Sequence, residues 1–278
     1  MGIVKRAGRL ASVCFALACG VACSHGDGDA TAATGEESTT GSHDSRPTIH
    51  YDQTGVLTVD GTPIEEKSYH SLLEGCQRSG SPTTPLTPDE VSKIGRVHSE
   101  AWIGPDKTSI HTESWEQDMP SPCHFTLTHK DQTEISEKSG HVTTIDTVGR
   151  TADVQETGPD TDVGPVPADD GEETDADRQA GWTKLAGQQS SGTNCSAWRD
   201  ARGAEVCVWS GGGRWGYSSS GVNAGQDGKS DGSVIVIWAK PGKGSSWRID
   251  TKVFTVGEPL PQQPFQVPAG ITINKASS

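Results

Sequence analysis

Short stretches of alternating apolar and polar residues, separated by turn residues, follow one another through most of the chain after residue 46. Alternation with a period of two places successive side chains on opposite faces of a β-strand. In the first half the stretches lie at 56–59, 97–103, 109–115, 124–129 and 141–148. In the second half they lie at 194–199, 205–209, 234–239, 247–256 and 270–273. The pattern predicts a mainly β protein built from short strands.

One segment is typical of a helix start. Thr87-Pro88-Asp89-Glu90 combines an N-cap residue, a proline at the first helical position and acids in the first turn, which predicts a short helix over 88–94. Ile and Val outnumber Leu, and the chain contains 34 Gly and 16 Pro, a balance that favours strands and turns. We therefore expect a curved, half-barrel-like antiparallel sheet with one or two short helices.

Two polar segments divide the chain. Residues 24–46 contain mainly Gly, Ser, Thr and Asp and are predicted to form a disordered tether. Residues 151–180 hold ten acids and one base, and we expect a solvated, disordered acidic insertion there, because the ligand spacing of a calcium-binding EF-hand loop is missing. The remaining parts, 47–150 and a Trp-rich 181–278, are predicted to be two β halves of one composite domain.

The N-terminus has the plan of an export signal. Lys5, Arg6 and Arg9 precede an uncharged apolar stretch that is too short to anchor in a bilayer, so residues 1–23 are predicted to be a signal peptide. The segment Gly20–Cys23 resembles a bacterial lipobox, with Cys23 as the lipidated residue, whereas cleavage before Cys19 is the competing interpretation. We expect export and lipid anchoring to the outer membrane, facing the periplasm; a soluble periplasmic protein is the alternative.

The number of cysteines supports Cys23, rather than Cys19, as the lipidated residue. Cleavage before Cys23 leaves the lipidated residue and an even set of four cysteines, which suits an oxidising compartment. Cys195 and Cys207 flank the turn at 200–203 and are predicted to bridge neighbouring strands, while a Cys76–Cys123 bond would close a long loop. The fold is thus expected to be disulfide-bonded.

A near-repeat within 97–115 is the clearest candidate for chemistry. Residues 98–102 read His-Ser-Glu-Ala-Trp, and residues 111–115 read His-Thr-Glu-Ser-Trp, on either side of the turn at 104–107. As a hairpin, the two copies would pair His98 with Glu113 and Glu100 with His111, with all four on one face together with both Trp residues. Such a face is a ligand set for zinc or another divalent ion. The alternative is charge and hydrogen-bond pairing between strands on a solvated face.

Tryptophan is concentrated after the acidic insertion, where six of the eight Trp residues lie. One interpretation is a ligand cavity or a carbohydrate-binding platform, formed by Trp residues that include Trp198, Trp209, Trp215 and Trp238. The alternative is that these rings supply most of the burial in a small core.

Charge and motifs exclude several functions. A net charge of −14 argues against nucleic-acid binding, which requires a basic face. Gly228-Lys229-Ser230 ends like a phosphate-binding loop, but Asn223 replaces the required glycine. No Gly-x-Ser-x-Gly or His-Glu-x-x-His motif occurs, so we expect no enzymatic activity and no resident cofactor.

Several short motifs carry a family resemblance: Gly192–Cys195, Trp198-Arg199, Glu205–Trp209 and Phe265–Gly270. Together they resemble the closing half of a group of bacterial exported proteins that are similar to the LolA/LppX-like carriers of lipids and lipoproteins. The resemblance covers roughly 185–273 and implies a half-barrel, lidded by short helices, with a hydrophobic cavity on its concave side.

These observations lead to one main function hypothesis and two others. The main hypothesis is a non-enzymatic cell-envelope lipoprotein that binds a hydrophobic or amphiphilic ligand, such as a lipid, or an envelope protein. The second is a divalent-metal-binding envelope protein that uses His98, Glu100, His111 and Glu113. An enzyme of unrecognised class is the third.

Overall fold

A computed structural model describes residues 47–157, 181–185, 188–190, 193–209 and 235–275. The first half contains β1 (Ile49–Val59), β2 (Thr62–Pro63), α1 (Ile64–Arg78), α2 (Pro88–Val91), β3 (Arg96–Ile103), β4 (Lys107–Ser121), β5 (His124–Glu137), β6 (His141–Asp146) and β7 (Thr151–Glu156). The second half contains β8 (Thr183–Lys184), β9 (Gln188–Ser190), β10 (Thr193–Arg199), β11 (Glu205–Trp209), β12 (Ile235–Lys240), β13 (Ser245–Val256), the 3₁₀ turn η3 (Gln263–Phe265) and β14 (Thr272–Lys275). The protein is mainly β, as predicted.

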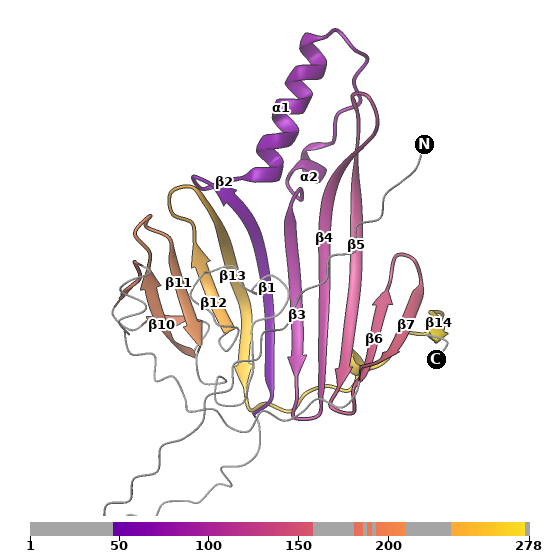
Figure 1. Cartoon of the computed structure of the whole chain (residues 1–278), viewed down its shortest axis with the longest axis vertical. Helices are drawn as coiled ribbons and strands as arrows, with labels where there is room; N and C mark the ends of the chain where they lie inside the picture. The colour runs from indigo at the N-terminus through magenta and orange to yellow at the C-terminus, as the bar shows by residue number, and fades with distance from the viewer. Residues whose placement is uncertain (1–46, 158–180, 186–187, 191–192, 210–234, 276–278) are drawn as a thin grey trace, which may run out of the picture. The chain divides into compact units, whose positions relative to one another are not determined.

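These strands form one open, curved sheet with the order β14-β7-β6-β5-β4-β3-β1-β13-β12-β11-β10-β8 (Figure 1). The short strands β2 and β9 lie off this path and pair with β1 and β10. Two antiparallel meanders, β3 to β7 and β10 to β13, lie on either side of β1. Strand β1 pairs with β3 and along its length with β13, which joins the two halves of the chain in a single sheet. One pair departs from the antiparallel prediction, because β14 runs parallel to β7 at the sheet edge.

The first residues of the predicted acidic insertion are part of the sheet. Thr151–Glu156 forms β7 and pairs with β6 on one side and β14 on the other, so the predicted boundary at 151 is wrong. The physical reason is the alternation of this segment, in which Ala152 is buried and Val154 half-buried on one face, while Asp153 and Gln155 are exposed on the other. The acids at 160–177, like the tether at 24–46, lie outside the described residues.

A buried amide fixes the register at the centre of the sheet. The pairing of β1 with β13 shifts between Asp52 and Gln53, and Gln53 is completely buried there. Its Nε2 atom donates to the carbonyl of Val236 at 2.7 Å and to the hydroxyl of Thr251 at 2.8 Å. Because a slip by one residue would leave these groups without their partners, the amide connects β1, β12 and β13 in one alignment.

The helices lie beyond one end of β1 and beside the β4–β5 hairpin (Figure 1). Helix α2 begins with the predicted capping box, in which the Thr87 hydroxyl accepts from the backbone N–H of Glu90 and the Glu90 carboxylate accepts from that of Thr87. Helix α1 was not predicted. Most of its side chains are exposed, and only Tyr69 and Cys76 are buried, so its apolar stripe is too narrow to stand out in the sequence.

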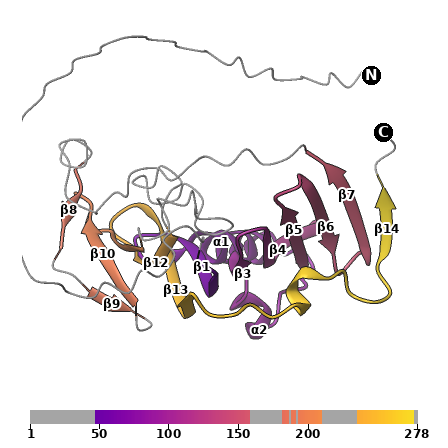
Figure 2. The same ribbon diagram turned by 90° about the horizontal axis from the view of Figure 1, so that it is seen from below.

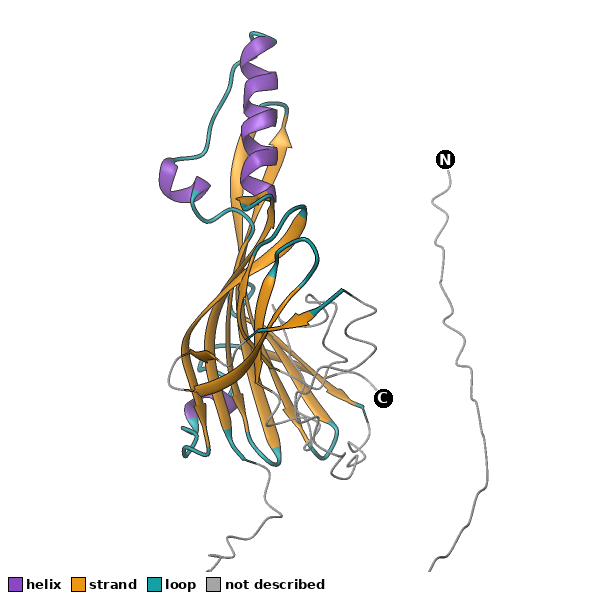
Figure 3. Cartoon of the chain, turned by 90° about the vertical axis from the view of Figure 1, so that its left-hand side faces the viewer, coloured by secondary structure: helices purple, strands orange, loops and turns teal. Residues whose placement is uncertain are grey.

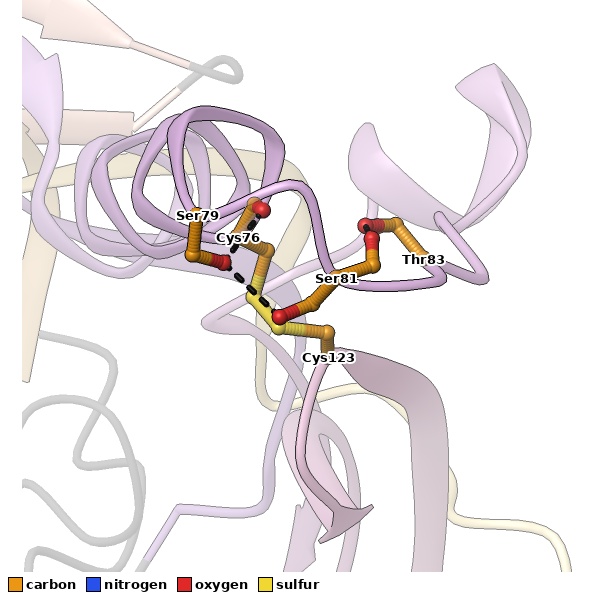
Figure 4. Close-up of a disulfide and its surroundings, with 5 residues drawn as sticks. All are labelled: Cys76, Ser79, Ser81, Thr83 and Cys123. Atoms are coloured by element: carbon orange, nitrogen blue, oxygen red, sulfur yellow. Dashed lines mark hydrogen bonds between the residues drawn. A yellow bond between two sulfur atoms is a disulfide. The ribbon is translucent and has the colours of Figure 1, made fainter.

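A disulfide ties the helical region to the sheet. Cys76 near the end of α1 bonds to Cys123 in the β4–β5 turn, with a Cα–Cα distance of 5.6 Å (Figure 4). Tyr69 and Phe125 pack edge to face beside it, and the Tyr69 hydroxyl accepts from the buried backbone N–H of Leu86. The second predicted disulfide, Cys195–Cys207, joins β10 to β11. Both predicted bonds are confirmed. Among the described helices, none is long and apolar enough to cross a membrane.

Two apolar clusters lie around the second meander. One combines the Cys195–Cys207 disulfide with Ile235, Ile237 and Phe254, and Trp209 and Trp238 pack against it. The other includes Trp182, Trp198 and Ile249. Trp198 and Trp209 thus belong to different clusters, because Trp198 lies opposite Val206 whereas Trp209 follows Cys207 by two residues and shares its face.

Candidate functional site

Four adjacent strands repeat one motif on the same face of the sheet. The motif is His-x-Asp or His-x-Glu, a histidine followed two residues later by an acid. It occurs in β1, β3, β4 and β5, as His50 and Asp52, His98 and Glu100, His111 and Glu113, and His129 and Asp131. Cross-strand pairs such as Asp52–Glu100, Glu100–His111 and Glu113–Asp131 place all eight side chains on one face, which we call the histidine face.

The predicted hairpin has the expected register but a wider set of contacts. His98 pairs with Glu113 as expected, with 2.9 Å between Nδ1 and Oε2. Glu100 lies opposite His111 in the strand register, yet its Oε1 atom contacts His50 Nε2 at 2.9 Å, on β1. His111 contacts Asp131 on β5 in the same way, with 2.9 Å between Nε2 and Oδ1. Glu100 and His111 of the hairpin therefore contact the flanking strands, β1 and β5, rather than each other.

His98 is at the centre of the histidine face. Its Nε2 atom lies 2.8 Å from Asp52 Oδ1, while its other ring nitrogen faces Glu113. Burial by itself lowers the pKa of His98, but the hydrogen bonds to Glu113 and Asp52 outweigh this effect and raise the pKa above its ordinary value. The ring of His98 also contacts the ring of His111 edge to face.

Two indoles fix further histidines by parallel stacking. Trp102 stacks on His50 with 5.2 Å between ring centroids, and Trp115 stacks on His129 with 5.1 Å. Both Trp residues come from the near-repeat and lie on the histidine face as predicted, with Trp102 opposite Ser109 and Trp115 opposite His129. The stacked rings have one defined orientation toward the neighbouring carboxylates.

The C-terminal segment crosses this face of the sheet. Residues 257–271 run from β13 below β1, β3 and β4 to β14 (Figure 2), and η3 lies on the same side of the sheet as α2 (Figure 3). The hydroxyl of Ser109 on β4 donates to the carbonyl of Pro264 at 2.7 Å. Val267 and Ile271 pack against the buried cluster of Ile135, Ile145 and Ala152. The crossing segment is thus attached to the sheet by one polar and one apolar contact.

Between the crossing segment and the histidine face lies a pocket of about 550 Å³. The sheet contributes Glu100, Trp102, Ser109, His111, Thr133 and Ile145 to its walls. The crossing segment contributes Pro261, Gln263, Pro264, Gln266, Val267, Pro268 and Ala269. Its size is within the usual range for sites that hold small molecules.

The predicted Trp residues lie elsewhere. Trp198 is only 1% exposed and packs inside its cluster, so it has almost no surface for a ligand. Trp209 and Trp238 pack against the cluster around the second disulfide. Trp215 and the lipidation candidate Cys23 lie outside the described residues. A second, smaller hollow of about 50 Å³ lies beside Trp182 and Trp247, and its described lining does not include Trp198, Trp209 or Trp238.

The structure does not bring the four predicted metal ligands together as one set. In the part of the chain that is described, three potential ligand atoms come within 4.8 Å of one another, and they belong to Glu113, His129 and Asp131. Of the four predicted ligands, only Glu113 is in this group. The sequence analysis missed the His-x-acid motifs of β1 and β5, although their spacing equals that of the two motifs it found.

The fold and the site define an open, curved β-sheet protein whose histidine-rich face is partly covered by its own C-terminal segment. No family model and no curated protein matches the chain. The resemblance to LolA/LppX-like carriers stays a prediction.

Proposed function

We propose that this chain is a non-enzymatic cell-envelope lipoprotein that binds a small amphiphile in the pocket below its crossing segment. The proposal rests on the floor of the pocket, which changes from polar at one end to apolar at the other. Cross-strand neighbours Glu100, His111, Thr133 and Ile145 form one row across β3, β4, β5 and β6. Because neighbouring strands lie about 4.8 Å apart, the row spans roughly 15 Å from a carboxylate to a buried aliphatic residue.

The crossing segment, which forms the roof of the pocket, also changes from polar to apolar in the direction from β3 to β6. Gln263 and Pro264 come earlier in the crossing segment, and Pro264 is attached to β4 through Ser109. Val267 follows and packs with Ile145. Polar groups therefore gather near β3 and β4, while the apolar part lies toward β6. An amphiphile would place its head group near Glu100 and Trp102 and its hydrocarbon part near Ile145 and Val267.

The charge of the pocket favours a cationic head group. Among the described residues that line the pocket, Glu100 is the one carboxylate, and neither lysine nor arginine occurs. A carboxylate beside an indole attracts an ammonium group through charge and through the ring face. A fatty acid or a phosphate monoester would be repelled by Glu100 and would meet no lysine or arginine in the described part of the lining.

The test compares three amphiphiles of equal chain length: decyltrimethylammonium, decyl maltoside and decanoate. Each is titrated below its micelle concentration into the purified full chain, with a metal chelator present, by isothermal titration calorimetry. We expect saturable binding at one site, tightest for the ammonium compound and weakest for decanoate. Equal affinity for the three compounds, or no binding of any, would contradict the proposal.

Variants locate the binding site. Trp102→Ala removes the indole of the pocket and is expected to weaken decyltrimethylammonium binding by about tenfold or more. Glu100→Gln should reduce the preference for the cation over decyl maltoside. Trp115→Ala is the matched control, because Trp115 is the equivalent residue of the near-repeat and does not line the pocket. An equal loss in both Trp variants would place the ligand elsewhere.

A further inference from the structure

A three-residue cluster on the histidine face lies outside the pocket. Glu113 on β4 is the direct cross-strand partner of Asp131 on β5, and His129 precedes Asp131 by two residues on the same face. One potential ligand atom from each lies within 4.8 Å of the other two. The Nε2 atom of His129 is 3.3 Å from Glu113 Oε1. This separation equals the distance of about 3.3 Å between two ligands of a tetrahedral ion with bonds of about 2.0–2.1 Å.

Each member of the cluster is oriented by a residue that lies outside it. His98 binds the Oε2 atom of Glu113 at 2.9 Å, which leaves the Oε1 atom facing His129. His111 binds Asp131 Oδ1, also at 2.9 Å. The ring of His129 is held by Trp115, with an angle of 11° between the two planes. Hydrogen-bonded partners of this kind fix the orientation of metal ligands in proteins.

The charge of the cluster favours a cation. Glu113 and Asp131 are directly opposite each other and only partly exposed, with 25% and 20% of their side-chain surface accessible. Within the described residues, no lysine or arginine forms an ion pair with either carboxylate; Lys252 and Lys130 contact Asp52 and Glu116 instead. Two carboxylates this close repel each other, and a divalent ion between them removes the repulsion.

We infer that Glu113, His129 and Asp131 form a site for a divalent transition-metal ion, with His98 and His111 as positioning residues. One imidazole and two carboxylates suit zinc, with water as a fourth ligand, and manganese less strongly. Magnesium, which keeps its waters and prefers oxygen ligands alone, fits poorly. The inference revises the ligand set His98, Glu100, His111 and Glu113, of which Glu113 is retained. It does not depend on amphiphile binding.

The experiment measures Zn²⁺ binding to the purified full chain by isothermal titration calorimetry, after chelator treatment, with Mn²⁺ and Mg²⁺ titrated in parallel. We expect one equivalent of Zn²⁺ to bind, more tightly than Mn²⁺, and no saturable binding of Mg²⁺. Zn²⁺ binding should weaken in acid, because protons compete with the metal ion for the ligand atoms.

Variants separate ligands from positioning residues. His129→Gln and Asp131→Asn remove ligand atoms and should each weaken Zn²⁺ binding by about 100-fold or more, whereas His98→Asn and His111→Asn should weaken it by about 10–100-fold. His141→Gln is the matched control: His141 contacts Glu156 at 2.6 Å, and the described residues supply no third ligand there. It should leave binding unchanged. Circular dichroism of each variant with chelator checks folding.

Three results would overturn the inference: no stoichiometric Zn²⁺ binding, unchanged binding in the folded His129→Gln variant, or an equal loss in His141→Gln. If a ligand variant fails to fold, Co²⁺ absorption of the wild-type chain decides. A tetrahedral spectrum at one equivalent supports the site, and an octahedral, solvated spectrum contradicts it.

Discussion

Removing the two disulfides separately should destabilise the protein to different extents. The Cys76–Cys123 bond closes a loop with a sequence separation of 47, whereas the separation for Cys195–Cys207 is 12. In the chain-entropy model, loops of these lengths correspond to about 4 and about 3 kcal/mol of stability. The double variant Cys76→Ala/Cys123→Ala should therefore lose about 1 kcal/mol more than Cys195→Ala/Cys207→Ala.

The packing of the cysteines predicts the opposite order of stability for the two double variants, so the measured order distinguishes packing from loop entropy. Cys207 is completely buried in the core of the second meander, while Cys76 and Cys123 are 9% and 8% exposed. Deleting buried atoms adds a cavity cost that the entropy model does not contain. If packing outweighed loop entropy, the Cys195–Cys207 variant would become the less stable one.

The assay is equilibrium unfolding in urea, followed by circular dichroism, for the wild-type chain and both double variants. With a slope of about 2 kcal/mol per M, losses of about 4 and about 3 kcal/mol shift the midpoint by about 2 and about 1.5 M. Peptide mapping without reduction confirms that the remaining bond is intact in each variant. A reversed order of midpoints, with both remaining bonds formed, would refute the loop-entropy reasoning.

Three further predictions concern the core, the histidine face and the anchor. Gln53→Leu should lower the free energy of unfolding in urea by about 1–3 kcal/mol, because the Val236 carbonyl and the Thr251 hydroxyl lose the buried amide. The control Gln155→Leu, at an exposed position, should be nearly neutral. Equal effects of the two variants would contradict the role of Gln53. In chelator-treated protein, the raised pKa of His98, which faces Asp52, Glu113 and the His111 ring, should give wild type a stability advantage over His98→Asn. That advantage is complete below about pH 6.5 and is lost as the pH rises through the folded-state pKa, so an advantage that grows with pH would be inconsistent with it. Cys23→Ala should abolish labelling by palmitate and release the chain from membranes, and labelling that persists would show that Cys23 is not the anchor.

Local patterns in the sequence predicted the fold class and many of the strands. The alternation around the turn at 104–107 gave the register of β3 and β4, in which His98 pairs with Glu113. The capping box predicted α2, and cysteine positions predicted both disulfides. In each case the determining interactions are close in sequence or limited to a few residue types. Helix α1 was missed because few of its residues are buried and its position depends on contacts with Leu86 and Phe125.

The pocket and the contacts of the histidine face could not be predicted from the sequence pattern, because they depend on contacts between segments far apart in the chain. The pocket exists because 257–271 returns across β3 to β6, more than 100 residues after those strands. No local signal in the sequence predicts that return. The contacts of Glu100 with His50 and of His111 with Asp131 depend on which strands flank the hairpin. Trp198 is a similar case, since its burial follows from the packing of β10 and β11 against neighbouring strands.

Hydrogen–deuterium exchange with bound decyltrimethylammonium tests the location of the ligand site most directly. The proposed function predicts slower exchange on binding in peptides that cover the crossing segment, 257–271, and the pocket strands around 100–111. Peptides from β10 to β12 should be unchanged. Protection confined to β10–β12, near Trp209 and Trp238, would contradict the proposed pocket and place the ligand in the Trp-rich half of the chain.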